Sequence, residues 1–274
     1  MENDGISVLM SVCHKDKPEF FAEAIESVLT QTLAPKEIVI IIDGHIDCQY
    51  EKIIYSYEKK YDTIKIYRYE ENRGLWYALN FGVNKCNYNF IARMDSDDIC
   101  VPYRFEKQMS IMKEKKYDLV GCNTIEFEND ISNIISRRLM PENHREIFEY
   151  SKKRNPFIHP SVMIRKNVLI NSGNYQKFLL FEDYHAWVQM IINGAKCYNI
   201  QENLVYMRVD KDFYKRRGGL SYIPKIIKFF NFLLKKKYIN LYEYFFTLLP
   251  RLIICIVPSG IREKFYKRKL RNKG

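Results

Sequence analysis

The feature that most constrains the fold of this chain is a regular alternation of short apolar runs with amphipathic segments. Apolar runs of strand length lie at residues 6–13, 37–42, 63–69 and 89–94, and segments with the apolar spacing of helices lie between them, at 18–29, 49–61 and 74–83. The run EIVIII has the near-continuous apolar character of a parallel strand that is buried on both faces. This pattern predicts a Rossmann-like α/β fold, with a mostly parallel sheet, helices on both faces and ligands at the carboxyl ends of the strands.

The pattern continues less regularly beyond residue 100. A helix is predicted at about 103–115, strands at 118–127, 161–165 and 204–209, and a helix at 183–192. The first helix has its own start signals, because Asp16 is a suitable N-cap and Pro18 fits an early helical position. Since no Ser- or Gly-rich linker interrupts these elements, we expect one continuous α/β domain over residues 1–214.

Carboxylates follow two of the predicted strands. Asp43 ends the run EIVIII, and Asp95, Asp97 and Asp98 come directly after the run FIARM. The ends of neighbouring parallel strands meet at the ligand-binding edge of a sheet, so we expect these side chains to converge. Clustered acids repel one another unless a cation lies among them, and oxygen ligands favour Mg²⁺ or Mn²⁺, which keeps open positions for nucleotide phosphates. The alternative is that the acids cap a helix ahead of Pro102, but their position after a buried strand favours the metal interpretation.

The chain resembles the bacterial family 2 inverting glycosyltransferases of the GT-A fold, the type found in capsule, exopolysaccharide (amylovoran-like) and O-antigen synthesis. The matching stretches lie in order over residues 6–209 and are specific as a set: ISVLMSV, AIESVLTQT, EIVIIIDG, NRGLWYALNFGV, FIARMDSDD, NPFIHPSVMIRK, and LLFEDYHAW followed by LVYMRV. The resemblance implies a nucleotide-sugar donor, UDP-linked, and a polyprenyl-diphosphate-linked glycan acceptor. It divides residues 1–214 into a nucleotide-sugar half (about 1–105) and an acceptor half (about 106–214).

Residue roles in that family correspond to four aspartates of this chain. The resemblance implies that Asp43 contacts the base or ribose of the donor, that Asp95 contacts the ribose, and that Asp97 binds the metal ion. Asp183 is implied to be the catalytic base.

The chain departs from the family pattern at two points. Cys13-His14 stands where many members have Thr-Tyr-Asn or Tyr-Asn, which leaves the base contact at that turn open, and the Q-x-x-R-W motif of processive members is absent, which favours addition of a single sugar.

An inverting transferase needs one general base, which deprotonates the acceptor hydroxyl while the nucleoside diphosphate leaves from the opposite face. Asp183 stands at the start of a predicted helix, where the helix dipole keeps a carboxylate ionised. The alternative for Asp183 and its neighbour Glu182 is a structural role as first-turn acids. Arg73 is a candidate donor contact or else an exposed turn arginine, and His159 is expected to be a hydrogen-bonded structural residue.

The positive charge of the chain is concentrated at its C-terminal end. The sequence carries 44 Lys and Arg against 33 Asp and Glu, but residues 215–274 hold 16 of the bases and two of the acids. The remainder has 28 bases and 31 acids, which argues against nucleic acid as the partner of the main domain. Arg216 and Arg217 precede two glycines, and two roles stay open for them: a hinged flap over the diphosphate, or a solvated basic linker.

Three apolar pieces lie in this basic segment, at residues 226–234, 242–249 and 252–257, separated by three lysines and by Pro250-Arg251. None reaches the roughly 20 residues that cross a bilayer. Aromatic-rich amphipathic segments with flanking Lys and Arg are typical of helices on an anionic membrane surface, so residues 215–274 are expected to form a membrane-associating tail. The alternative is that these faces pack back onto the main domain. Because the N-terminus lacks a basic secretory start and no C-x-x-C pair occurs, we expect a cytoplasmic protein, peripheral on the inner face of the cell membrane.

Two other functions compete with sugar transfer. A non-catalytic module that binds a polyanion or a membrane accounts for the basic tail but leaves the four aspartates unexplained. A sugar nucleotidyltransferase shares the fold class, but the Gly-rich loop with Lys or Arg expected after its first strand is absent. The sequence therefore favours a non-processive, inverting, metal-dependent glycosyltransferase that uses Mn²⁺ or Mg²⁺.

Overall fold

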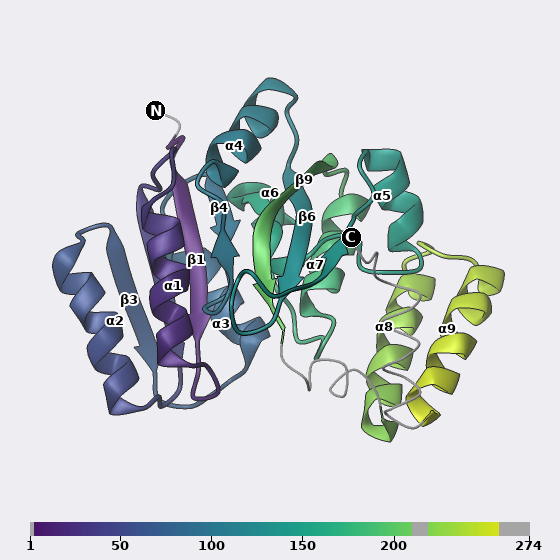
Figure 1. The fold of residues 1–274 in the computed structure, drawn as a ribbon. Helices are drawn as coiled ribbons and strands as arrows, with labels where there is room; N and C mark the ends of the chain where they lie inside the picture. Colours follow the sequence, from purple (N-terminus) through teal and green to yellow (C-terminus); the bar gives the residue numbers. More distant parts are fainter. Residues whose placement is uncertain (1–2, 210–218, 258–274) are drawn as a thin grey trace.

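The computed structural model describes residues 3–209 and 219–257, and within these ranges nine strands form one sheet (Figure 1). The strand order is β3-β2-β1-β4-β8-β6-β9-β5, with β7 paired to β6. The strands are β1 (Ile6–Val12), β2 (Glu37–Asp43), β3 (Ile64–Tyr69), β4 (Phe90–Arg93), β5 (Ile99–Cys100), β6 (Leu119–Phe127), β7 (Ile134–Arg138), β8 (Met163–Arg165) and β9 (Cys197–Arg208). The first four strands are parallel, as are β6 and β9, whereas β8 is antiparallel to both β4 and β6.

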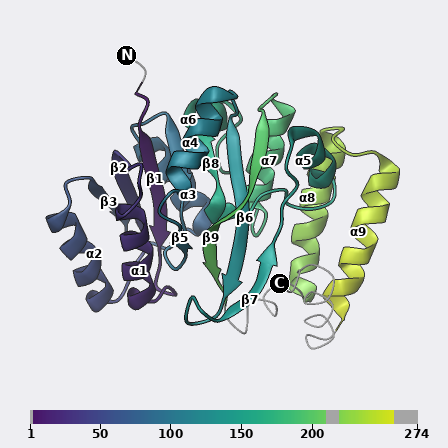
Figure 2. The ribbon, with the colours of Figure 1, turned by 45° about the horizontal axis from the view of Figure 1, so that its top comes forward.

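Helices cover both faces of this sheet (Figure 2). On one face lie α1 (Pro18–Leu29), α2 (Cys48–Lys60) and α4 (Arg104–Glu114); on the other lie α3 (Leu75–Lys85), α5 (His144–Ser151), α6 (Lys166–Asn171) and α7 (Glu182–Ile192). Alternate residues of the strands supply the two cores: in β2, Ile38 and Ile40 pack toward α1, whereas Val39 and Ile41 pack toward α3. The predicted fold class is confirmed.

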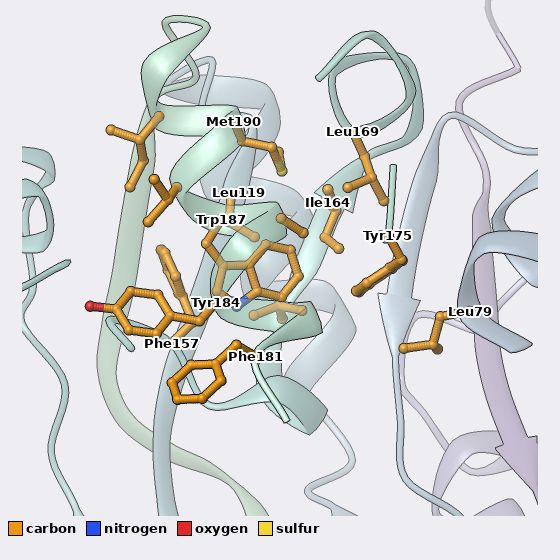
Figure 3. Packing of buried hydrophobic residues seen from close by; sticks show 14 of the residues in the cluster. Leu79, Leu119, Phe157, Ile164, Leu169, Tyr175, Phe181, Tyr184, Trp187 and Met190 are labelled. Atoms are coloured by element: carbon orange, nitrogen blue, oxygen red, sulfur yellow. The ribbon is translucent and has the colours of Figure 1, made fainter. Parts of the chain in front are cut away.

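The core on the α3 side fixes the position of α7. Trp187 of α7 is fully buried, and Figure 3 shows its indole among side chains from several elements. Its ring centroid lies 6.1 Å from that of Phe157 and 6.0 Å from that of Tyr175, both in edge-to-face geometry. This packing holds the first turn of α7 against the segments that flank β8.

The last two helices lie side by side at the end of the molecule beyond α7 (Figure 1). Helix α8 (Ile223–Lys235) buries four apolar side chains in the same cluster as Trp187: Ile226, Phe229, Phe230 and Leu233. Helix α8 therefore packs onto the main domain, which was the alternative considered for the tail. Helix α9 (Leu241–Ile256) instead leaves seven apolar side chains exposed: Leu241, Tyr242, Phe245, Phe246, Leu249, Ile253 and Ile256.

Neither of these helices, nor any other in the described ranges, is long and apolar enough to cross a membrane. The remainder of the predicted tail, including Arg216 and Arg217, lies outside the described residues.

Two local predictions are wrong. Helix α1 has Lys17, not Asp16, at its N-cap position, because the Asp16 carboxylate accepts hydrogen bonds from Cys13 N (2.9 Å) and Ser96 Oγ (3.1 Å) instead. Pro250 does not divide the tail, since α9 runs through it as one helix. Buried side chains on both sides of the proline, Leu248 and Cys255, keep the two parts of α9 packed on one face, which offsets the lost backbone hydrogen bond.

Candidate active site

Asp43 organises the turn that leads into α3. Its two carboxylate oxygens accept hydrogen bonds from the backbone N–H groups of Arg73 (2.7 Å) and Gly74 (3.0 Å). Gly44 follows with φ of +82°, and a Cβ there would lie 2.6 Å from the backbone N of Asn72, so this close approach requires glycine. The predicted donor contact Asp43 therefore also holds the loop before α3 against the end of β2.

Arg73 lies at the surface beside this turn. Its Nη1 donates a hydrogen bond to the Tyr77 hydroxyl (2.9 Å), and its guanidinium carbon lies 4.8 Å from the centroid of the Tyr77 ring. The structure thus places Arg73 close to Asp43, with its guanidinium group against the Tyr77 ring. Both roles considered for it, a donor contact and an exposed turn arginine, agree with this position.

The aspartates after β4 form a tight cluster. One carboxylate oxygen from each of Asp95, Asp97 and Asp98 lies within 4.8 Å of the others. Burial, reinforced by the charges of Asp95 and Asp16, raises the pKa of Asp97 to about 7, and burial also raises the pKa of Asp98. Strand β5, and not a helix, follows the cluster, so these acids are not the helix caps that the alternative interpretation required.

The cluster fits a divalent cation. Asp98 Oδ2 is buried and has no hydrogen-bond partner among the described residues, and burial together with repulsion among the carboxylates raises the pKa values of Asp97 and Asp98. Three convergent carboxylates are ligands of the kind that Mg²⁺ and Mn²⁺ prefer. The sequence predicted that these three side chains converge, with Asp97 as the metal ligand and Asp95 as a ribose contact, and gave Asp98 no role of its own.

Two arginines brace this cluster. Arg93, at the end of β4, is buried and forms an ion pair with Asp95. Arg208, at the end of β9, donates from its backbone N to Asp98 Oδ1 (2.8 Å) and from its Nε to the carbonyl oxygen of Asp97 (3.0 Å). Neither arginine was predicted as a site residue, although both lie in the matched stretches FIARMDSDD and LVYMRV.

Asp183 lies in the first turn of α7, as predicted. Asn155 Nδ2 donates a hydrogen bond to Asp183 Oδ2 (2.6 Å), and the backbone N–H of Tyr184 donates to Asp183 Oδ1 (2.7 Å). Asn155 precedes β8, so its hydrogen bond orients the carboxylate from a second element. The neighbouring Glu182 is half-buried, and burial together with the charge of Asp183 raises its pKa to about 7. Both carboxylates accept backbone hydrogen bonds, those of Glu182 from its own N–H group and from that of Leu180, and Asp183 also accepts one from the Asn155 side chain.

Tyr175 is a buried tyrosine near both groups of acids. Its buried hydroxyl is close enough to Arg93, Asp183 and Asp95 for all three charges to act on it, and burial raises its pKa. His159 Nε2 lies 3.2 Å from the same hydroxyl, and desolvation lowers the pKa of His159 far below its usual range. His159 is thus a neutral, hydrogen-bonded residue, as expected.

The strand order 3-2-1-4 is that of a doubly wound α/β sheet, and the aspartates follow the carboxyl ends of its strands, where such sheets bind ligands. The chain belongs to glycosyltransferase family 2: the profile described as "Glycosyl transferase family 2" matches residues 7–175. The prediction of a glycosyltransferase is confirmed.

Full-length relatives support this assignment. An Escherichia coli protein named UDP-Gal:alpha-D-GlcNAc-diphosphoundecaprenol beta-1,3-galactosyltransferase is 36% identical over 97% of this chain and 96% of its own length. The amylovoran biosynthesis glycosyltransferase AmsE of Erwinia amylovora is 32% identical over 96% of this chain and 98% of its own length.

Solved structures show the same fold at lower identity. The mannosyltransferase PcManGT from Pyrobaculum calidifontis, in complex with GDP-Man and Mn²⁺, superposes with a TM-score of 0.64 at 12% identity, covering 94% of this chain and 71% of that one. A fragment (1–349) of S. aureus TarS in complex with UDP-GlcNAc gives a TM-score of 0.61 at 17% identity, covering 81% of this chain and 66% of the fragment. The chain spans 40% of the longer TarS chain.

Proposed function

We propose that this glycosyltransferase moves one hexose from a UDP-linked donor to a lipid-diphosphate-linked glycan, with a divalent metal ion and with inversion at the anomeric carbon. The substrate classes are supported by the Escherichia coli relative, whose name specifies UDP-Gal and a GlcNAc-diphosphoundecaprenol acceptor. The metal is supported by the fit of the aspartate cluster and by the neighbour that was solved with Mn²⁺.

The observation that carries the proposal is that the structure holds two sets of carboxylates, the aspartate cluster after β4 and Asp183 in the first turn of α7, and that charges from both act on the buried Tyr175 hydroxyl. Asp43 and Asp95 are assigned to the nucleoside of the donor, and Asp95, Asp97 and Asp98 would hold Mg²⁺ or Mn²⁺. A bound ion of this kind would offset the charge of the departing diphosphate.

Asp183 is the general base. Its carboxylate, oriented by Asn155, accepts the proton of the acceptor hydroxyl as that oxygen attacks the anomeric carbon. The bond from the anomeric carbon to the diphosphate breaks on the opposite face of the sugar, so the nucleoside diphosphate leaves and the configuration inverts. The division into a nucleotide-sugar half (about 1–105) and an acceptor half (about 106–214) follows the same arrangement, since Asp43, Asp95 and Asp97 lie in the first half and Asp183 in the second.

The test is Asp183→Asn, with Glu182→Gln as the matched control. Loss of the base is expected to lower kcat by about 10²-fold or more, while the affinity for the UDP-sugar stays unchanged, because the carboxylate acts on the acceptor. Glu182→Gln is expected to stay within a few-fold of the wild type. NMR of the product should show an inverted anomeric centre. Normal turnover by Asp183→Asn, or a retained configuration, would contradict the mechanism.

We further propose that the protein attaches to the anionic inner surface of the cell membrane through α9. The exposed apolar side chains of this helix form a face suited to the interface, and basic residues flank it, with Lys235, Lys236 and Lys237 before it and further Lys and Arg in the sequence after residue 257. Each such charge near an anionic surface contributes about 1 kcal/mol. This attachment would bring the active site to a lipid-linked acceptor.

A further inference from the structure

A groove runs along the face of α8 that points away from the core. Its volume is about 670 Å³, within the roughly 300–1,000 Å³ range of small-molecule sites. Apolar side chains form most of its wall: Phe178 from the loop before α7, and Ile223, Pro224, Ile227 and Phe232 from α8. The groove therefore suits a ligand with apolar surface and few hydrogen-bonding groups.

Lysines form the rim of this groove. Lys228, Lys235 and Lys236 line it, and no acidic residue does. In the part of the chain that the structure describes, none of these three ammonium groups has a carboxylate within ion-pair distance. The Lys228 ammonium lies 5.0 Å from the centroid of the Phe178 ring, so the positive rim directly adjoins the apolar wall there. The rim is positive and suits an anionic group.

The groove adjoins the turn that carries Asp183. The Phe178 ring stacks on His185 of α7, with ring centroids 4.0 Å apart and planes 15° apart, and His185 is in the same helical turn as Asp183. Burial and the charges of Lys236 and Lys228 lower the pKa of His185 to about 4, so this imidazole is neutral and leaves the charge of the rim in place. One wall of the groove is therefore attached directly to the segment that holds the general base.

We propose that this groove binds the isoprenoid chain of the lipid-linked acceptor, with the rim lysines facing its phosphate groups. This inference rests on the proposed function, which supplies the acceptor class. An isoprenoid diphosphate combines a long apolar chain without hydrogen-bonding groups and an anionic end, which matches the apolar wall and the lysine rim. A peptide would need partners for its backbone N–H and C=O groups, and the wall offers few.

The experiment compares two acceptors in detergent micelles, which remove the bilayer. Both carry N-acetylglucosamine diphosphate, linked in one to undecaprenol and in the other to a hexyl group. Ile227→Glu places a charge in the groove, and Ile253→Glu, at a position of α9 that is 63% exposed, is the matched control. We expect Ile227→Glu to lower kcat/KM at least about tenfold for the undecaprenyl acceptor and to leave the hexyl acceptor within twofold, because a buried methylene or two accounts for such a factor. Ile253→Glu should change neither.

A second variant tests the rim independently of folding. Lys228 is exposed, so Lys228→Glu is expected to fold, and it should raise KM several-fold for both acceptors without changing KM for the donor. Equal losses on the two acceptors with Ile227→Glu, no loss on either, or an unchanged acceptor KM with Lys228→Glu would overturn the assignment. So would a groove that serves only phospholipid, in which case Ile227→Glu lowers vesicle binding and leaves the micellar assay unchanged. Failure of the wild type to glycosylate either acceptor would instead refute the proposed function.

Discussion

Deletion of α8 tests where the folded domain ends. The four side chains that α8 contributes to the core, Ile226, Phe229, Phe230 and Leu233, are each at most 2% exposed. Full burial of one such side chain contributes about 1.5–3 kcal/mol, so the four together contribute about 6–12 kcal/mol. This is as large as the whole stability of an ordinary domain, about 5–15 kcal/mol. A chain that ends at Gly219 is therefore expected not to fold.

Helix α9 provides the comparison for this deletion. It buries only Leu248 and Cys255 among its apolar side chains, so its removal is expected to cost roughly 2–4 kcal/mol. A chain that ends at Asn240 should keep a cooperative unfolding transition at a lower Tm and lose binding to anionic vesicles. Circular dichroism during heating and urea titration, followed by co-sedimentation with vesicles, measures both. A chain ending at Gly219 that unfolds cooperatively with an unchanged midpoint would refute the reasoning, since α8 would then lie outside the cooperative core.

Three further predictions concern the site and the membrane face. Asp97→Asn should abolish transfer without changing Tm by more than a few degrees, and chelation of the wild type should do the same and be reversed by Mn²⁺ or Mg²⁺; full activity after EDTA and dialysis would count against the metal role. Asn155→Ala should lower kcat by about tenfold at constant donor KM, because one charge-assisted hydrogen bond of 2.6 Å to the base is lost. Asn84→Ala, at an exposed position, serves as the control. A changed donor KM would mean that Asn155 acts on the donor and not on the base. Phe245→Asp should reduce flotation with anionic vesicles and leave transfer to a soluble acceptor unchanged, and equal flotation of variant and wild type would exclude α9 as the contact.

The first half of the fold was predictable because its signals are local. Strands β1, β2 and β4 are buried on both faces, so most of their residues are apolar, and the helices between them show one apolar face each. A helix at residues 183–192, which corresponds to α7, was also predicted. The aspartates were found because acids that directly follow buried strands have few structural explanations.

The second half was harder to predict because its buried polar residues form hydrogen bonds with residues that are far away in the sequence. Strand β9 begins at Cys197, seven residues before the predicted start at Leu204, and its first part contains the buried Asn199. The Asn199 side chain donates to the carbonyl oxygens of Pro141 (2.7 Å) and Pro156 (3.2 Å), partners that the local pattern cannot indicate. Strands β5 and β7 and helices α5 and α6 were not predicted, since they are short elements of two to eight residues.

Local pattern and long-range packing also have to be distinguished for α8. Its charged and apolar residues alternate as they do in a membrane-surface helix, and the sequence alone leaves both interpretations open. The structure separates the two faces: Phe229 and Phe230 enter the core, while Lys228 and Lys235 line the groove. An amphipathic pattern thus specifies that one face is buried, and only the tertiary packing specifies against what.

The charges around the aspartate cluster explain why the site needs a cation when its donor is an anion. Asp16 lies beside the three clustered aspartates, since its charge acts on Asp97 and it accepts a hydrogen bond from Ser96 between them. Among the described residues, the guanidinium groups of Arg93 and Arg208 partly neutralise these four carboxylates. Arg208 also forms an ion pair with Glu23 (2.5 Å). The local excess of negative charge would repel a nucleoside diphosphate, and a divalent ion would offset most of this excess. Donor affinity should therefore depend on the metal ion even in the absence of acceptor.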